Sequence, residues 1–465
     1  MRNSNPTSVR VPDPGISALF EQDARWQAWL CVEAALAKAE AELCMIPAAA
    51  AEEIISKCKL SLFDRLRLEE GFRRTAHSLV PLIWELSRLC EGEAGNYVHW
   101  GATTQNITQT GDLLQLRKAH RIYLQQLSAI LAALADLAER SKDMALPGRT
   151  HGQHAVPAAY GLKVAIWIDE FARHVERMQD CESRVFVAQL GGAAGTVASF
   201  GDQGLEVQAR MAAVLNMPPM AVPARSIMDH LAEHIMLLAL LAASCGKFAN
   251  EIYTGMKQEF GEVEEPISPG TVGSSTMPQK RNPHLSQDIM AYAAQIRALV
   301  PLALECVMTE HEANRQTSLM MRHAQTQACI LLGDTLERVR ILAEGLVLNP
   351  DRMRANLDLT EGLIMAEPVM LALGEYVGRQ EAHDIVYDAA QAAAVGDSGF
   401  SDLLAADHRV SAHLSREQVD GLLDPTRYTG LCSWLAEEQS ARARDLSHTL
   451  NQASEAKIAS AKICR

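Results

Sequence analysis

A glycine- and serine-rich segment, Glu265 to Pro283 (EPISPGTVGSSTMPQKRNP), combines residue types that suit the binding of a small anion. Glycines such as Gly270 and Gly273 free the backbone to turn, so that successive N–H groups can converge on one point. Lys280 adds a formal positive charge. Together these groups suit a carboxylate or a developing enolate. A plain surface loop with a solvated lysine is the alternative that the residue types alone leave open.

Two other segments break a chain that is otherwise rich in helix-forming residues. They are His99 to Gly111 (HWGATTQNITQTG) and Gly148 to Gly161 (GRTHGQHAVPAAYG). Hydroxyl and amide side chains in the first segment can donate hydrogen bonds to a carboxylate. Histidines in the second segment titrate near neutral pH and can transfer a proton. Loops on a rigid scaffold often carry function, so all three segments are candidate parts of a site.

The elements that must position these segments are long amphipathic helices. Apolar residues recur every three or four positions over residues 15–43, 112–139, 226–259, 286–300 and 324–346. The alternation that marks strands is nearly absent, so the sequence predicts an all-α fold. Helices this long bury their apolar stripes against one another in an elongated bundle. Their apolar faces exceed what one bundle needs, which predicts packing against other subunits.

The chain is too long for one hydrophobic core. It has 465 residues, whereas single cores stop growing at roughly 250–300 residues. Composition shifts near Thr110 and Leu359 place the expected boundaries. The predicted division is an N-terminal helical domain of residues 1–110, a central long-helix bundle of residues 111–358 that carries the segment 265–283, and a C-terminal helical domain of residues 359–465.

Composition and charge exclude several classes of protein. Hydrophobic residues make up 48% and charged residues 22% of the chain, which is typical of a globular protein. The net charge of −14 comes without a block of Lys or Arg, so no nucleic-acid partner is expected. The N-terminus lacks the apolar run of a signal peptide, and no apolar stretch reaches the about 20 residues of a membrane span. The ten cysteines show no metal-ligand or CxxC spacing, so a cytoplasmic protein without a metal site is predicted.

The run GSSTMPQKRNP, from Gly273 to Pro283, resembles the signature loop of the aspartase/fumarase superfamily, whose usual form is GSSxMPxKxNP. The other two segments fall where that superfamily places its motifs HxGATSxDxxDT and THxQxAxP, so the resemblance covers the whole chain. It implies a homotetramer of three-domain helical subunits, with each active site assembled from three subunits. It also implies a small polycarboxylate substrate and no cofactor, and the sequence contains no nucleotide, flavin or metal motif.

The resemblance assigns roles within the signature loop. Ser274 matches the catalytic serine, which removes a proton from the carbon next to a carboxylate. Lys280 and Asn282 match the residues that hold this carboxylate, and backbone N–H groups from Ser275 to Met277 would stabilise the enolate. A serine is a poor base at its ordinary pKa, so it must act as an oxyanion in a closed, positively polarised loop. The glycines and prolines allow the loop to close as a lid.

The other two motifs supply an acid and carboxylate-binding groups. Thr150 and His151 match the pair that faces the substrate, and His151 takes the place of the general acid that protonates the leaving nitrogen. His154 has no such match and is interpreted as structural. Asn106 and Gln109 stand where aspartates are usual, but the donors that hold a substrate carboxylate are kept. These donors are His99, Thr103, Thr104 and Gln105.

Three further residues stay open between two interpretations. His77, in TAHSLVP, sits where adenylosuccinate lyases carry a further active-site histidine, and it is placed among the substrate-binding candidates. A surface histidine is the alternative. Arg315 and Arg322 are candidates for the variable end of the substrate, and solvated helix-face arginines are the alternative.

Flanking sequence favours the branch shared by adenylosuccinate lyase and 3-carboxy-cis,cis-muconate cycloisomerase. EAALAKAEAEL, NLDLTEGL and LDPTRYTG resemble the cycloisomerases. Bacterial cycloisomerases of this branch commonly have tryptophan at the position of His151, which favours an elimination that needs a proton donor. The Arg-Tyr pair that adenylosuccinate lyases use near a nucleotide phosphate is missing before Phe20. SIMDH, from Ser226 to His230, replaces an arginine-rich stretch, so the substrate is expected to differ from those of both enzymes.

The leading hypothesis is therefore a carbon–nitrogen lyase. It would reversibly eliminate an amine from an N-substituted aspartate-like polycarboxylate and release fumarate. The runner-up is a lactonising 3-carboxy-cis,cis-muconate cycloisomerase. A non-catalytic structural homologue, like the lens crystallins related to this superfamily, is a third alternative, against which the retention of Ser274 and His151 argues.

Overall fold

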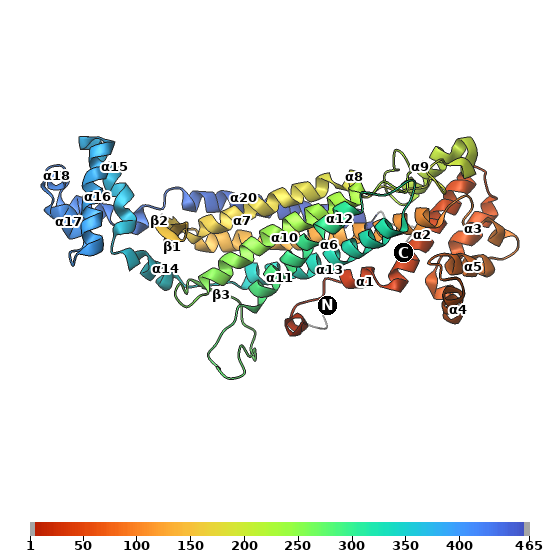
Figure 1. Cartoon of the computed structure of the whole chain (residues 1–465), viewed down its shortest axis with the longest axis horizontal. Coiled ribbons are helices and arrows are strands. Elements are labelled where there is room, and N and C mark those ends of the chain that lie inside the picture. Colours follow the sequence, from red (N-terminus) through yellow and green to blue (C-terminus); the bar gives the residue numbers. More distant parts are fainter. Residues whose placement is uncertain (1–4, 460–465) are drawn as a thin grey trace.

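The computed structural model describes the backbone of residues 5–459 and the side chains of residues 5–453. The molecule is an elongated bundle of long helices with a smaller group of helices at each end (Figure 1). The bundle helices are α6 (Thr104–Ser141), α7 (Tyr160–Asp180), α10 (Asp229–Gly255), α11 (His284–Ala298), α13 (Arg315–Gly345) and α20 (Cys432–Ala459), with the short α8 (Glu182–Val185) and α12 (Val300–Glu305) beside them. The predicted all-α fold is confirmed.

The helices at the two ends of the bundle come from the two ends of the chain, with one exception. The N-terminal end holds α1 (Ile16–Leu19), α2 (Gln22–Glu42), α3 (Ala48–Lys57), α4 (Arg65–Thr75) and α5 (Val80–Leu89), together with α9 (Gly204–Val214). The other end holds α14 (Pro350–Leu357), α15 (Ala366–Val377), α16 (Arg379–Val395), α17 (Phe400–Ala406), α18 (His408–Ser411) and α19 (Arg416–Leu422).

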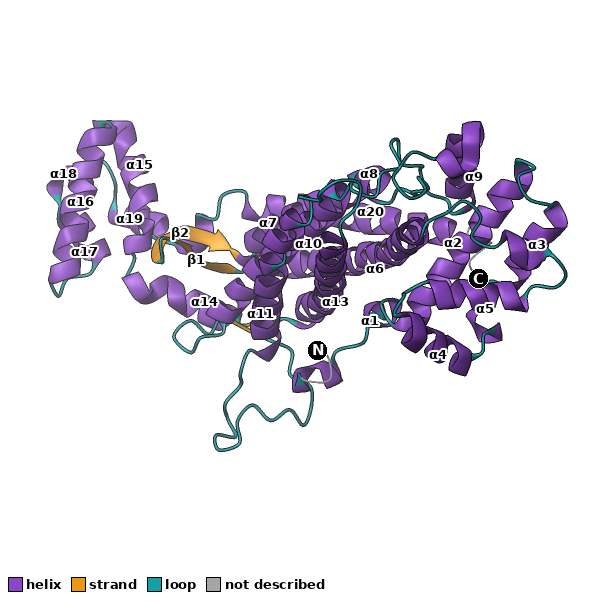
Figure 2. Ribbon diagram, turned by 45° about the vertical axis from the view of Figure 1, so that its right-hand side comes forward, coloured by secondary structure: helices purple, strands orange, loops and turns teal. Residues whose placement is uncertain are grey.

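Strands form two short antiparallel pairs in the described part of the chain (Figure 2). They are β1 (Ala145–Thr150) with β2 (Gln153–Ala159), and β3 (Val263–Glu264) with β4 (Val347–Leu348). The expectation that the segment 148–161 is a loop was therefore wrong, because most of it forms the β1–β2 hairpin. The segment 99–111 was also expected to interrupt the helices, yet α6 already begins at Thr104.

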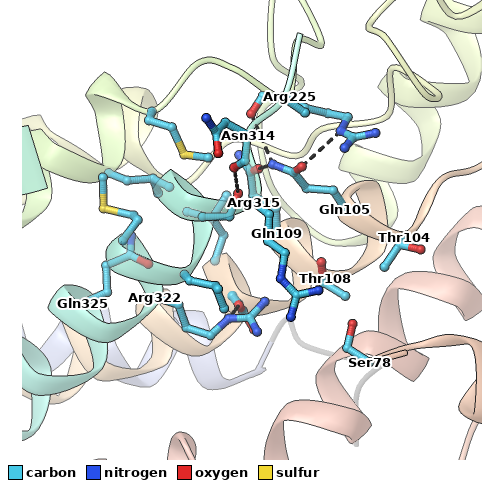
Figure 3. Close-up of a pocket in the computed structure, with 18 of the residues that line it drawn as sticks. Ser78, Thr104, Gln105, Thr108, Gln109, Arg225, Asn314, Arg315, Arg322 and Gln325 are labelled. Carbon is cyan, nitrogen blue, oxygen red and sulfur yellow. Dashed lines mark hydrogen bonds and ion pairs between the residues drawn. The ribbon is translucent and has the colours of Figure 1, made fainter. Parts of the chain in front are cut away.

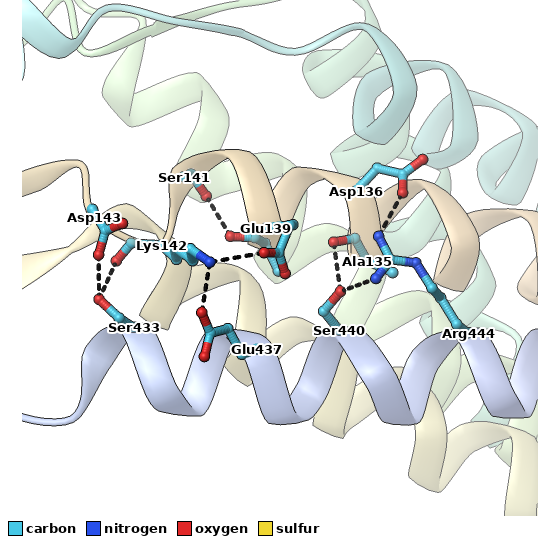
Figure 4. A network of polar contacts seen from close by, with 11 residues as sticks. Ala135, Asp136, Glu139, Ser141, Lys142, Asp143, Ser433, Glu437, Ser440 and Arg444 are labelled. Carbon is cyan, nitrogen blue, oxygen red and sulfur yellow. Dashed lines mark hydrogen bonds and ion pairs between the residues drawn. The ribbon is translucent and has the colours of Figure 1, made fainter.

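The last helix of the chain returns to the bundle and runs beside α6 (Figure 4). Ser440 donates a hydrogen bond to the carbonyl of Ala135 at 3.0 Å, and Lys142 forms an ion pair with Glu437 at 2.5 Å. Ala443 of α20 is fully buried in the main core. A separate small core is formed by residues between 369 and 419. The division into three domains at residues 110 and 358 stays a prediction, and it places α20 with this C-terminal group.

α10 is the one helix of the described chain that is long and apolar enough to cross a membrane. Of its most apolar stretch, 56% is buried inside the protein. Leu238, Ala242 and Phe248 are fully buried in the main core, where α10 packs against α11 and α13. Its position at the centre of the bundle accounts for its composition.

Glu40 is an unusual acid on α2, because it is buried in an apolar setting. Its side chain is 1% exposed, and neither carboxylate oxygen has a hydrogen-bond partner within residues 5–453. Burial, together with the negative charge of Glu33, raises the pKa of Glu40 to about 9. The folded protein must therefore hold this carboxyl protonated at neutral pH.

Replacing Glu40 with glutamine is expected to stabilise the protein at neutral and alkaline pH. A carboxyl whose pKa is raised on folding costs stability as pH rises from its unfolded value of 4.5 towards about 9. At pH 7 this cost is roughly 3 kcal/mol. Thermal unfolding of Glu40→Gln should show a higher Tm than the parent at pH 8 and the same Tm near pH 4.5. Glu42→Gln, an exposed acid on the same helix, is the control and should not reproduce this pH-dependent gain.

Candidate functional site

A cavity of about 490 Å³ lies where α6 and α13 begin (Figure 3). Four stretches that are far apart in sequence line it, namely residues 76–78, the first turns of α6, the residues around the start of α10, and residues 313–325. Hydroxyl, amide and guanidinium groups make up much of its wall, so the cavity suits a small polyanion. The predicted residues that lie in the wall are His77, Thr103, Thr104, Gln105, Arg315 and Arg322.

His77 turns one ring nitrogen to the backbone and the other to the cavity. Its Nδ1 accepts hydrogen bonds from the N–H groups of Leu79 and Val80 at 3.2 and 3.1 Å. A nitrogen that accepts two N–H groups carries no proton, so the ring proton lies on Nε2. Nε2 lies 3.5 Å from Thr104 Oγ1. His77 thus lies in the cavity wall and is placed to donate a hydrogen bond into the cavity.

Gln105 orients Arg225, a residue that was not predicted from the sequence to be part of the site. Its Oε1 accepts a hydrogen bond from Arg225 Nε at 3.0 Å, and its Nε2 donates to Gln109 Oε1 at 2.9 Å. Arg225 Nη1 also donates to the carbonyl of Ala193 at 2.8 Å. Burial lowers the pKa of Arg225. The signal that could have found Arg225 is its place directly before SIMDH, the stretch in which a cation was expected and not found.

Asn106 holds the start of α6 against a neighbouring loop. It is fully buried, and its Oδ1 accepts hydrogen bonds from the N–H groups of Thr103 and Gly192, both at 3.1 Å. An amide oxygen thereby does what one oxygen of the usual aspartate could do. Asparagine in place of the usual aspartate therefore still fixes the start of α6 against the loop at Gly192.

His99 lies beside the cavity and is absent from its wall. Its backbone is left-handed, with φ of 61°, and its Nδ1 lies 2.7 Å from Glu33 Oε1. Burial opposes the charged ring, but the Glu33 carboxylate outweighs this effect and raises the pKa of His99. The arrangement suits a residue that anchors the first segment to α2.

His151 stands at the tip of the β1–β2 hairpin and is exposed. Thr150 pairs with Gln153, so His151 and Gly152 form a two-residue turn, and both have positive φ, of 53° and 77°. Positive φ at both central residues is typical of a type I′ turn, whose twist matches that of the strands. The hairpin therefore presents His151 away from the body of the bundle.

Two other side chains of the hairpin are directed towards the protein. Arg149 binds Glu262 through two hydrogen bonds, of 2.6 and 3.1 Å, and so ties the hairpin to the chain that leads into the signature loop. His154 is half-buried, and burial together with the charge of Arg149 lowers its pKa. These contacts agree with a structural interpretation of His154.

The signature loop surrounds the Ser274 hydroxyl with backbone donors. Ser274 Oγ accepts hydrogen bonds from the N–H groups of Thr276 at 3.3 Å and Met277 at 3.1 Å. The Asn282 amide donates to the carbonyl of Gly273 and closes the base of the turn. A Cβ at Gly273 would lie 2.1 Å from the Lys280 carbonyl oxygen, so only glycine fits there. Donors aimed at Oγ favour its oxyanion, which is the form that can act as a base.

The remaining predicted residues of the loop, Ser275, Met277 and Lys280, are exposed. Among the described residues, no group of three or more His, Cys, Asp or Glu side chains is placed to hold a metal ion.

The three segments lie far apart within one chain (Figure 1). Thr104 is the first residue of α6, which has 38 residues, and the hairpin follows its last turn. At 1.5 Å per residue, α6 separates the cavity from the hairpin by about 57 Å. α10 has 27 residues, starts beside the cavity and leads to the signature loop. It separates the cavity from that loop by about 40 Å. The structure brings part of the first segment, from Thr103 to Gln109, into one cavity with His77 and three arginines, namely Arg225, Arg315 and Arg322. It does not bring His99, His151 or Ser274 into that cavity.

Comparisons with known proteins agree with this architecture. Residues 8–298 match the family described as Lyase, and residues 362–438 match the family described as Adenylosuccinate lyase C-terminus. The chain is 37% identical over 421 residues to N-acetyl-S-(2-succino)cysteine lyase of Enterococcus italicus, covering 90% of this chain and 92% of the relative. It is 39% identical to 3-carboxy-cis,cis-muconate cycloisomerase of Pseudomonas aeruginosa, covering 89% and 91%. A crystal structure of fumarate lyase from Mesorhizobium sp. BNC1 superposes with a TM-score of 0.86 at 34% identity, covering 92% and 98%.

Proposed function

Because this chain is an enzyme of the aspartase/fumarase superfamily of lyases, we propose that it eliminates an amine from an N-substituted aspartate-like polycarboxylate and releases fumarate. The observation that carries this proposal is the Ser274 hydroxyl, which accepts two backbone N–H groups in an exposed loop. His151 supports it as an exposed proton donor at the tip of a hairpin, where a neighbouring chain can reach it.

In the proposed reaction, the Ser274 oxyanion removes the proton from the carbon next to the distal carboxylate. The electron pair of the C–H bond passes into that carboxylate, and Lys280, Asn282 and nearby backbone N–H groups stabilise the resulting enolate. The enolate then collapses to form the double bond of fumarate as the carbon–nitrogen bond breaks. His151 delivers its proton to the departing nitrogen. Thr103 and Thr104 would hold a substrate carboxylate through their hydroxyls.

We further propose that the protein is a cytoplasmic homotetramer in which three subunits contribute to each site. The length of α6 supports this proposal, because a single chain cannot bring Thr104 and His151 to the same substrate. Large apolar side chains are also exposed along the bundle, as expected for a surface that packs on other copies. They include Ile166, Met236, Leu240 and Leu304.

Two related reactions have specific support. The relative from Enterococcus italicus is named for a thioether of succinate, which favours a sulfur leaving group in place of nitrogen. The relative from Pseudomonas aeruginosa is named 3-carboxy-cis,cis-muconate cycloisomerase. For this chain the corresponding reaction would be lactonisation, in which a carboxylate adds to a double bond. His151 favours elimination of an amine, because an amine is a poor leaving group that gains most from a proton donor, whereas a thiolate can leave unprotonated.

The ultraviolet absorbance of fumarate tests the proposal directly. The purified protein is offered N-substituted aspartates, S-substituted succinates and 3-carboxymuconate in parallel. We expect fumarate from the N-substituted series at the highest kcat/KM. Faster release from the S-substituted series would move the assignment to a carbon–sulfur lyase, and lactone formation without fumarate would favour the cycloisomerase. If neither the N-substituted aspartates nor the S-substituted succinates released fumarate, the proposed elimination would be contradicted.

A further inference from the structure

We infer that the cavity at the start of α6 and α13 contains a second anion subsite, which binds a carboxylate carried by the leaving group of the substrate. The subsite is formed by Gln109, Arg315, Arg322 and Gln325. The inference rests on the proposed function and narrows it, because it makes the released amine or thiol itself an acid.

Two buried amide groups in the cavity wall are donors without an acceptor. Gln109 is 8% exposed and Gln325 is 6% exposed, and within the described residues neither Nε2 has a hydrogen-bond partner. The amide of Gln109 cannot simply be reversed, because its Oε1 already accepts a hydrogen bond from Gln105. A buried donor left unpaired is costly, so these groups indicate a ligand that brings acceptor oxygens.

The charge of the cavity points to the same ligand. Three arginines line it against one carboxylate, that of Asp112, in a chain whose net charge is −14. Asp112 is already engaged, because Arg322 Nε binds its Oδ2 at 3.2 Å and Arg25 Nε lies 3.3 Å from its Oδ1. Asp112 therefore orients Arg322. One carboxylate cannot neutralise three arginines, so the cavity keeps an excess of positive charge.

All four residues line the same cavity, Gln109 from α6 and the other three from α13. Arg315, Arg322 and Gln325 follow at i, i+7 and i+10 on α13, so they share one face of that helix. Arg315 is exposed at the first position of α13, and Figure 3 draws it with Arg322 around the same cavity. The N-termini of α6 and α13 both open onto this space, and their dipoles favour an anion.

This subsite is separate from the group that would hold the succinate part. Thr103 and Thr104 lie at the beginning of α6, whereas Gln109 lies five residues further, which is about 8 Å along the helix. A cavity of about 490 Å³ has room for a succinate and a short acidic substituent. The substrate class is accordingly a succinate joined through nitrogen or sulfur to a small acid.

Binding to a catalytically silent oligomer tests the subsite without depending on turnover. The probes are 2-[(carboxymethyl)amino]succinate and its 2-[(carbamoylmethyl)amino]succinate counterpart, which differ only in the charge of the substituent. Calorimetry in the Ser274→Ala background should show the acid binding about tenfold or more tightly than the amide. Arg315→Gln and Gln325→Leu should each weaken the acid by about tenfold and leave the amide within about twofold. Arg210→Gln, on α9 outside the cavity, should change neither.

Equal affinity of the parent background for the two probes would overturn the subsite. An equal loss of affinity for both probes in Arg315→Gln would also overturn it, and so would the failure of both probes to bind. The proposed function fails on a different result, namely the absence of fumarate from either series in the turnover assay. Even then, tighter binding of the acid probe than of the amide probe would support the subsite, provided that Arg315→Gln removes the difference.

Discussion

The Ser274→Ala variant is expected to lose activity by on the order of 10³-fold in kcat/KM for fumarate release. The hydroxyl is the only group of that side chain, and two backbone N–H groups are aimed at it. Alanine keeps the backbone of the turn but removes the atom that would take the substrate proton. Because Ser274 lies in a half-exposed loop, the Tm should stay at the parental value.

Steady-state kinetics with the best substrate of the fumarate assay measure this effect, and the Tm checks the fold. Ser268→Ala is a matched control, since it removes an exposed hydroxyl from the same loop outside the predicted site. Turnover by Ser274→Ala within a few-fold of the parent would contradict the role of Ser274 as base. A parental KM with a greatly reduced kcat would support it.

Mixing two inactive variants is expected to restore activity. One partner is Ser274→Ala, and the other carries Thr103→Val and Thr104→Val, which remove hydroxyls that would hold a substrate carboxylate. Each lost hydrogen bond to a charged group costs about 1.5–3 kcal/mol, so the double variant should be about 10²- to 10⁴-fold less active. The two lesions lie about 40 Å apart in one chain, because α10 separates them. A site that draws these parts from different subunits can therefore combine an intact loop with an intact α6.

Random reassembly of the two variants, after mild denaturation and refolding, should restore roughly a quarter of the parental activity, because each part of a site comes from an intact chain half of the time. A chain with all three substitutions, mixed with Ser274→Ala, provides no intact loop and should restore nothing. Mixed oligomers that stay as inactive as the separate variants would contradict shared sites. Recovery would also show that both variants fold.

The helical architecture followed from the sequence because its cause is local. Spacing of apolar residues by three and four positions predicted the helices that became α2, α6, α10, α11 and α13. The ends were less well predicted. Residues 104–111 contain threonine, asparagine and glycine, which are weak helix formers. Burial of Ile107 and Thr110 against neighbouring elements nevertheless makes them the first turns of α6.

The β1–β2 hairpin escaped prediction for a different reason. Its strands are short, and the pattern in GRTHGQHAVPAAYG lacks the alternation of a half-buried strand. Pairing between Ala145 and Ala159 and the contact between Arg149 and Glu262 stabilise the hairpin, and both depend on parts of the chain outside the segment. The hairpin carries His151, the proposed proton donor, to an exposed tip.

The sequence by itself determined the helical class and the chemical groups at hand, namely a serine in a glycine-flanked turn, a Thr-His pair and a run of hydroxyls. These are properties of residue type and spacing along the chain. Only the tertiary structure decided which groups face one another. Arg225, Gln109 and Gln325 line a cavity because helices remote in sequence begin at the same end of the bundle. The unpaired amide donors of Gln109 and Gln325, and the excess positive charge of the cavity, arise only where these helices meet, since hydrogen bonding and electrostatics act through space.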